Sequence, residues 1–277
     1  MNREISFIKC NPTQNMTILV KTDQPVEEYA NIASKIMAYD SVYAEQVGFI
    51  RKPKKLEAAA YLQMAGGEFC GNACMALAAY LASKEGIQPN RLTEITLEAS
   101  GTDHLVICQV KQSAEQFHCH LSMPFPNKIE QRIIMYEGME LDIAIVRYTD
   151  FIHIVMEVEA FTDTARERAQ SLARLLGVTL GANLIGILLY NTNTNEMAPL
   201  IYVPPLDSMI WERGCGSGTA SVGAYLAWKH GGPITAPIRQ PGGTIQVTAQ
   251  CDNEGMTSLA IDGVVGIVAE GKAYVEI

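Results

Sequence analysis

The sequence has few charged residues, no basic run and no long apolar run, and each absence excludes a class of protein. Charged residues make up 18% of the 277 residues, and the net charge is −9. Nucleic acids are bound through Lys and Arg contacts to phosphate, so we expect no nucleic-acid partner. No stretch reaches the roughly eighteen apolar residues of a membrane span, and the start lacks the apolar segment of a secretory signal. The composition predicts a soluble, cytoplasmic protein without membrane contact.

The cysteines do not form a recognisable disulfide or metal pattern. There are seven, an odd number at irregular spacing, unlike the framework of a small secreted protein. Cys74 lies one turn after Cys70, but zinc would need two further ligands, and none lies at a suitable spacing. His118 and His120 share one face of a predicted strand, which we interpret as a solvated face. With no phosphate-binding glycine loop either, we expect no metal and no cofactor.

One short pattern occurs twice, half a chain apart. Cys70-Gly71-Asn72-Ala73 and Cys215-Gly216-Ser217-Gly218 each lead into an alanine-rich apolar segment, and the two cysteines are 145 residues apart. This spacing is about half of the chain and predicts two related halves. Helices are predicted over 71–85 and 216–230. Because both are apolar on all sides, we expect them to be buried.

The rest of the chain is mostly short strand-like runs joined by turns. Two more helices are predicted over 25–37 and over 163–176, the second ending at Gly177. Strands near the end are predicted over 257–262, 264–269 and 272–276. We therefore predict an α/β fold of the α+β type, with two pseudo-symmetric domains. Each would be a curled antiparallel sheet wrapped around one apolar helix, with the active site between them.

The segment 123–127 is the candidate linker, because its two prolines cannot donate to a strand ladder. The first domain would span 1–124 and carry Cys70. The chain would return to it with a final strand over 265–277. The second domain would span 125–264 and carry Cys215.

The two cysteines are the candidate catalytic residues. A cysteine at a helix N-terminus lies at the positive end of the macrodipole, which lowers the thiol pKa and favours the thiolate. Two such thiols suit the removal of a proton from one face of a carbon atom and its delivery to the other. The first-turn N–H groups at Gly71-Asn72 and at Gly216-Ser217 suit the binding of a carboxylate. Cys70 and Cys215 are thus predicted as the acid and base that act at the Cα of an amino acid.

These motifs resemble those of the cofactor-independent amino-acid racemases of the diaminopimelate epimerase and proline racemase superfamily. The segment 68–73 is similar to the epimerase signature, and 240–244 resembles the late Pro-Gly-Gly hairpin of the family. In the second half, Glu212-Arg213-Gly214 directly precedes Cys215, a spacing nearer to that of proline racemase.

Within this superfamily the sequence most resembles the histidine racemases that supply D-histidine to staphylopine-type metallophore pathways. The likeness runs through 11–12, 15–20, 45–50, 199–202, 215–221 and 271–274. The resemblance implies a racemase that needs no pyridoxal phosphate, interconverts L- and D-histidine by 1,1-proton transfer and forms a homodimer. It also implies these substrate-binding residues: Asn15, Glu45, Gln46, Gly71, Asn72, Glu212, Gly216 and Ser217.

The substrate is inferred from polar residues that are missing. Epimerases bind the second amino-acid head of diaminopimelate, but an expected asparagine is Met64 here, and Phe151 begins the segment that corresponds to Asn-Pro-His. A buried carboxylate without partners is costly, so these changes favour a shorter substrate such as histidine. Arg213 instead favours a diaminopimelate epimerase. That epimerase and a catalytically silent binding protein of the same fold are the alternatives.

Overall fold

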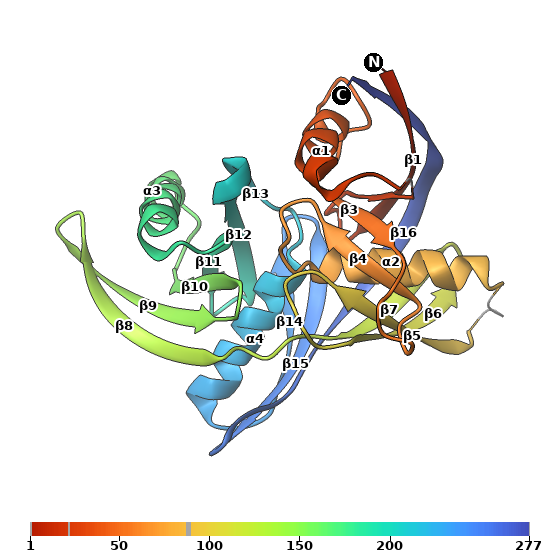
Figure 1. Ribbon diagram of the computed structural model, residues 1–277. Coiled ribbons are helices and arrows are strands. Elements are labelled where there is room, and N and C mark those ends of the chain that lie inside the picture. The colour runs from red at the N-terminus through yellow and green to blue at the C-terminus, as the bar shows by residue number, and fades with distance from the viewer. Residues whose placement is uncertain (1, 22, 87–89, 277) are drawn as a thin grey trace. The chain divides into compact units, whose positions relative to one another are not determined.

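The computed structural model describes residues 2–21, 23–86 and 90–276, which form two compact units (Figure 1). Unit 1 contains the chain up to Ser122 and the segment from Asp262 onward, and unit 2 is Met123–Ile261. Within the described ranges, no helix is long and apolar enough to cross a membrane.

Unit 1 is a sheet that closes on itself around a helix. Its strands follow the order β1-β2-β3-β4-β5-β6-β7-β16, and β16 also pairs with β1. They are β1 (Asn2–Pro12), β2 (Thr17–Val20), β3 (Gln46–Arg51), β4 (Ala60–Met64), β5 (Leu92–Ala99), β6 (Val106–Ser113), β7 (Gln116–Ser122) and the second part of β16 (Gly255–Glu276). Helix α2 (Gly71–Lys84) packs against β1, β2 and β4 to β7, so the strands surround it (Figure 1).

The sequence of α2 explains this position. Every residue from Gly71 to Tyr80 is buried, as an all-round apolar helix requires. The second helix of the unit has a different character. Helix α1 (Tyr29–Met37), preceded by the 3-10 turn η1 (Val26–Glu28), is amphipathic and buries one face against β1, β2 and β3.

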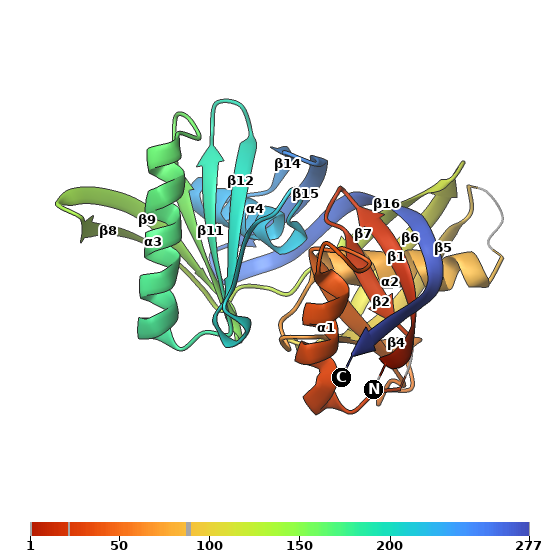
Figure 2. The ribbon, with the colours of Figure 1, turned by 90° about the horizontal axis from the view of Figure 1, so that it is seen from above.

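Unit 2 is a sheet with a helix on each face. Its order is β16-β15-β14-β12-β11-β10-β9-β8, and β13 pairs with β12. Its strands are β8 (Lys128–Tyr136), β9 (Met139–Arg147), β10 (Phe151–Glu157), β11 (Leu184–Asn191), β12 (Glu196–Val203), β13 (Ser208–Trp211), β14 (Ile234–Gln240), β15 (Gly243–Asp252) and the first part of β16; a 3-10 turn, η2 (Pro204–Leu206), follows β12. Helix α4 (Gly216–His230) packs against β9 to β11, β14 and β15, and α3 (Asp163–Leu180) against β11 and β12 from the other side (Figure 2).

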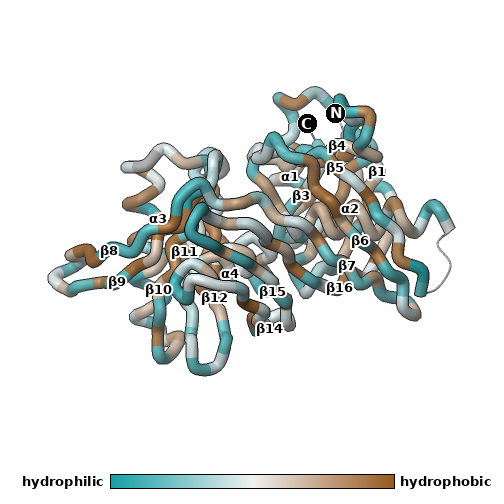
Figure 3. Tube along the Cα trace, turned by 90° about the horizontal axis from the view of Figure 1, so that it is seen from below, coloured by the Kyte–Doolittle hydropathy of each residue, from teal (hydrophilic) through white to brown (hydrophobic). Residues whose placement is uncertain are grey.

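The central strand β11 shows the effect of this double cover. All eight of its positions are buried, and its Ile and Leu residues belong to the hydrophobic, brown end of the colour scale in Figure 3. A strand covered on both faces is expected to be apolar throughout rather than alternating. The side chains of Ile185, Ile187 and Leu189 belong to the core under α3, so the residues between them face α4.

Each unit contains parallel strand pairs, where the sequence predicted antiparallel sheets. The parallel pairs are β2–β3, β4–β5, β10–β11 and β12–β14. Parallel neighbours need a crossover connection, and here each crossover contains one of the helices α1, α2, α3 and α4 in turn. The segment β2-α1-β3-β4-α2-β5 thus corresponds to β10-α3-β11-β12-α4-β14. This correspondence is the structural form of the sequence repeat.

Two predicted boundaries were wrong. Helix α3 continues through Gly177 to Leu180, and its C-cap is Gly181, which has the left-handed conformation with φ 61°. A Cβ at Gly177 would lie 2.6 Å from the ring of Tyr202, so a larger residue here would require that ring to shift. The strands predicted over 257–262, 264–269 and 272–276 form a single strand, β16.

Candidate active site

Cys70 and Cys215 occupy the same position at the start of α2 and of α4. Each is the N-cap residue with an extended backbone, at φ −134° and ψ 108° for Cys70 and φ −117° and ψ 108° for Cys215. The sulfur of Cys70 accepts a hydrogen bond from the N–H of Ala73 at 3.4 Å, and that of Cys215 from Gly218 at 3.3 Å. A donor aimed at the sulfur stabilises its negative charge, so both positions suit acid–base chemistry.

In unit 1 the thiol of Cys70 joins a chain of polar side chains. It donates to Oε1 of Gln46 at 2.9 Å, and Nε2 of Gln46 donates to Oδ1 of Asn15 and, at 2.8 Å, to Oγ1 of Thr17. Nδ2 of Asn15 then donates to Oε2 of Glu45 at 2.8 Å. Asn15 and Thr17 are completely buried. Their hydrogen bonds in this buried network fix the orientation of the side-chain amides of Asn15 and Gln46. The thiol and a carboxylate are thus linked through two amides.

The remaining predicted residues of unit 1 form the first turn of α2. Gly71 and Asn72 are both buried and directly follow Cys70. Gly216 and Ser217 have the same place in α4, where Gly216 is buried and Ser217 is half-buried. Backbone N–H groups in a first turn have no acceptor within the helix, which is the property that suits them to a carboxylate.

In unit 2 the surroundings of Cys215 are more charged. Cys215 is 2% exposed, and its thiol is hydrogen-bonded to the carboxylate of Glu212. Burial, and then the charge and hydrogen bond of Glu212, hold the pKa of this thiol well above its ordinary value, while Ser217 and the N–H of Gly218 lower it. The helix N-terminus lowers this pKa as predicted, through the N–H of Gly218, but burial and the neighbouring anion outweigh it and the net shift is upward.

The predicted site residues thus form two groups, one in each unit. Three polar contacts were missed by the sequence analysis, and they involve Thr17, Thr219 and Gln240. Thr17 supports Gln46, while Thr219 and Gln240 contact the backbone of Cys215. Thr219 and Gln240 lie in motifs that carry the family resemblance. Because neither side chain titrates or binds metals, nothing in the sequence marked these two residues as functional. Among the described residues, no three His, Cys, Asp or Glu side chains gather as a metal site would require.

The family model described as "Histidine racemase CntK N-terminal domain" matches residues 4–274. The chain belongs to the histidine racemase family. It is 32% identical over 279 residues to a curated histidine racemase of Staphylococcus aureus, and the match covers 100% of both chains. It is 30% identical to a histidine racemase of Fusobacterium nucleatum, covering 98% of this chain and 97% of that relative. These matches make the protein an isomerase of the amino-acid racemase class.

Solved structures confirm the fold class of this racemase. A hydroxyproline epimerase from Agrobacterium vitis matches with a TM-score of 0.67 and 12% identity, covering 99% of this chain and 94% of that one. A methylitaconate-delta-isomerase matches with a TM-score of 0.61 and 11% identity, covering 99% and 96%. At these identities the likeness shows the fold alone, an α+β architecture shared over the whole chain.

Replacing Glu212 with Gln in the enzyme is expected to lower the pKa of the Cys215 thiol. The carboxylate raises that pKa by its charge and its hydrogen bond, so a neutral amide of the same shape removes both effects. The measurement is a pH titration by NMR of protein labelled with ¹³C at the cysteine Cβ. The signal of Cys215 should titrate at lower pH in Glu212→Gln than in the parent, while Glu254→Gln, at an exposed position, leaves it unchanged. A Cys215 titration that stays in place or moves to higher pH contradicts this account.

Proposed function

We propose that the enzyme interconverts L- and D-histidine, with Cys70 and Cys215 as its two acid–base residues. The observation that carries the proposal is the matched placement of the two thiols, each capping a buried helix at the equivalent point of the repeat. The substrate is proposed from the curated relatives, which are histidine racemases. Together these observations favour proton transfer at the Cα of histidine.

The proposed reaction conserves protons and electrons without a cofactor. One sulfur, as thiolate, takes the Cα proton and becomes a thiol, and the electron pair of the C–H bond moves into the carboxylate to give a planar carbanion. The other sulfur, as thiol, donates its proton to the opposite face of Cα and becomes a thiolate. The configuration is inverted, and the two sulfurs have exchanged protonation states. Positioned acid–base groups of this kind contribute roughly 10²- to 10⁴-fold to a rate.

The carbanion is stabilised where its charge develops. Charge spreads from Cα into the substrate carboxylate, which we assign to the first-turn N–H groups at Gly71-Asn72 and at Gly216-Ser217. Fixed backbone dipoles at two helix N-termini need no reorganisation during the reaction, so they stabilise the transition state more than the ground state.

The two sulfurs have different partners, and this difference suggests different supporting roles. Cys215 contacts the carboxylate of Glu212, which can hold the thiol proton directly. The thiol of Cys70 donates to the neutral amide of Gln46, and Glu45 is reached through Asn15. We assign Glu212 to proton exchange at Cys215, and Glu45 with Asn15 to substrate binding, where an imidazole N–H or the α-ammonium has an acceptor.

Met64 and Phe151 support histidine over diaminopimelate. Both side chains belong to the cores of their units, at 1% and 3% exposed, and the ring of Phe151 stacks on Tyr148 at 4.1 Å. Neither position supplies the polar partner that a second amino-acid head would need.

The test is Cα–H exchange followed by ¹H NMR in deuterated buffer with reductant, with L-histidine, diaminopimelate and proline offered separately. We expect the Cα–H signal of histidine to disappear while D-histidine forms. Exchange with diaminopimelate alone would establish the epimerase alternative. A chain that binds histidine without exchange would be the silent binding protein.

We also propose the setting of this activity. The resemblance to staphylopine-type enzymes suggests that D-histidine serves metallophore synthesis, in the cytoplasm and by a homodimer. The odd number and irregular spacing of the seven cysteines suit a reducing compartment. Size-exclusion chromatography with light scattering measures the oligomeric state directly.

A further inference from the structure

Gln240 and Thr219 together bind both polar groups of the Cys215 backbone. Its Oε1 accepts from the N–H of Cys215 at 2.7 Å, and its Nε2 donates to Oγ1 of Thr219 at 2.9 Å. Because a backbone N–H can only donate, the amide oxygen must face Cys215 and the NH₂ group must face Thr219. Oγ1 of Thr219 in turn donates to the carbonyl of Cys215 at 2.7 Å. One side chain therefore holds the N–H directly and the carbonyl through Thr219.

The turn 240–243, which joins β14 to β15, also holds the chain just before Cys215. The N–H of Gly242 donates to the carbonyl of Arg213 at 2.6 Å, and Nη2 of Arg213 donates to the carbonyl of Pro241 at 3.3 Å. With the contact from the Gln240 side chain, these bonds connect Arg213 and Cys215, at the start of α4, to one turn. A displacement of that turn would move the thiol with it.

We propose that Gln240 is a positioning residue for Cys215, and that the turn 240–243 is a clamp that keeps this cysteine in its N-cap geometry. The proposal rests on the proposed function, in which this thiol exchanges a proton with Cα. The bond from Gly218 to the sulfur, at 3.3 Å, requires the N-cap conformation of Cys215. A thiol that loses this geometry loses both a stabilising donor and its aim at the substrate carbon.

The two halves differ in what their glutamines hold. Gln46 accepts from the thiol of Cys70 itself, whereas Gln240 binds the backbone of Cys215. Removing Gln240 therefore takes no hydrogen-bond partner from the sulfur directly. Any change at the Cys215 thiol in such a variant must come from a change of geometry, which makes Gln240 a clean test position.

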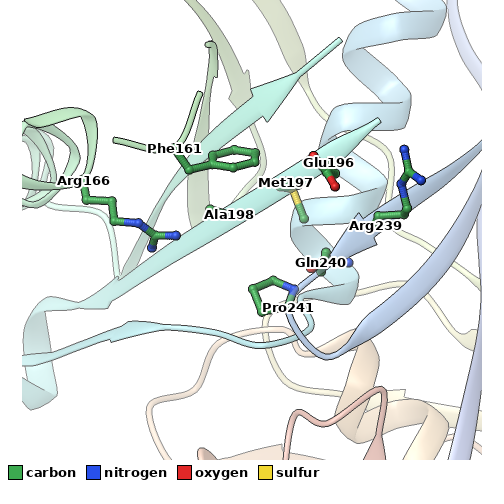
Figure 4. Close-up of a pocket in the computed structure, with 8 residues that line it drawn as sticks. All are labelled: Phe161, Arg166, Glu196, Met197, Ala198, Arg239, Gln240 and Pro241. Carbon is green, nitrogen blue, oxygen red and sulfur yellow. The ribbon is translucent and has the colours of Figure 1, made fainter. Parts of the chain in front are cut away.

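A neighbouring pocket provides room for the substitution. Gln240 and Pro241 line a pocket of about 240 Å³ whose walls also include Phe161 and Arg166 (Figure 4). A leucine at position 240 has this space available, so Gln240→Leu removes the hydrogen bonds without forcing Cys215 aside. The exposed Gln246 on β15 offers the matched control, Gln246→Leu.

The test combines steady-state racemisation with ¹³C NMR of labelled cysteine Cβ atoms. In Gln240→Leu we expect kcat to fall at least 10-fold, the Cys215 signal to move and titrate at higher pH, and the Cys70 signal to stay in place. Thr219→Val should reproduce these changes more weakly, and Thr219→Ser, which keeps the hydroxyl, should restore them toward the parent. Gln246→Leu should match the parent in every measurement.

Two results would overturn the clamp. One is a Gln240→Leu enzyme with the kcat of the parent. The other is a loss of kcat with an unmoved Cys215 signal, which would give Gln240 a role other than positioning this thiol. If Gln240→Leu does not fold, equal Cys215 signals in Thr219→Val and Thr219→Ser would reject the proposal. The NMR signals need no turnover, so a parent without histidine racemase activity would contradict the proposed function and still leave the clamp testable.

Discussion

Replacing either Cys70 or Cys215 with serine is expected to lower the rate of histidine racemisation by about 10³-fold, since each removes one of two acid–base groups. A serine hydroxyl is a far weaker acid than a thiol. Near neutral pH it does not ionise, so it can neither take the Cα proton as an anion nor readily give up its own proton. The rate is measured by circular dichroism of L- and D-histidine at saturating substrate. The loss should appear in kcat, because the N–H groups assigned to the carboxylate are backbone groups that both variants retain.

The control for these variants is another cysteine of the same helix. Cys74 lies one turn after Cys70 and is completely buried, and burial raises its pKa to about 12. Cys74→Ala should cost some stability through the small cavity it leaves, but it should keep most of the racemase activity. Activity within 10-fold of the parent in Cys70→Ser or in Cys215→Ser would reject the two-cysteine mechanism.

Replacing Gly101 with Ala is expected to destabilise unit 1 by about 3 kcal/mol and to abolish most of the activity. The free-energy cost of a positive φ at alanine and the cost of overpacking its Cβ add together. Gly101 has φ 71°, and a Cβ there would lie 2.2 Å from the backbone N of Phe69. Ser100 beside it donates to the carbonyl of Glu68 at 2.8 Å. This turn supports the backbone that enters Cys70, and a backbone cannot yield as a flexible side chain would. Urea denaturation measures the stability.

Gly67 is the matched control for this prediction. It lies in the same approach to Cys70 and has φ 79°, but no described atom lies within 4 Å of its Cβ position. Gly67→Ala should therefore cost only about 1 kcal/mol, the conformational penalty alone. Equal effects of the two substitutions would show that the contact with Phe69 contributes nothing.

Much of the fold followed from local patterns in the sequence. The two all-round apolar segments predicted buried helices, and α2 and α4 begin at Gly71 and Gly216 as expected. The repeat of Cys-Gly predicted two related halves around those helices, and the family resemblance predicted the fold class. The parallel strand pairs were not predicted, because an apolar strand has the same sequence pattern whether its neighbour runs parallel or antiparallel.

The candidate site was predictable to the extent that its residues carry chemistry. Cysteine and glutamate are conspicuous in a sequence, whereas Gln240 and Thr219 act through backbone contacts that only the folded chain brings together. The net direction of the pKa shift of Cys215 could not be predicted for the same reason. The helix dipole can be inferred from the sequence, but the burial of the thiol and its contact with Glu212 depend on packing.

The strand β16 has a consequence for the order in which the protein acquires its structure. It begins in unit 2 and ends in unit 1, where it pairs with β1 and closes the sheet. During synthesis, the first 122 residues leave the ribosome early. The sheet of unit 1 cannot close, however, until the segment from Asp262 has been made. Unit 2 is continuous in sequence and is complete before that point. The later half is thus free to fold first, the reverse of the usual N-to-C order. Until that point β1 pairs with β2 alone, and its other edge stays open to a chaperone or a neighbouring chain.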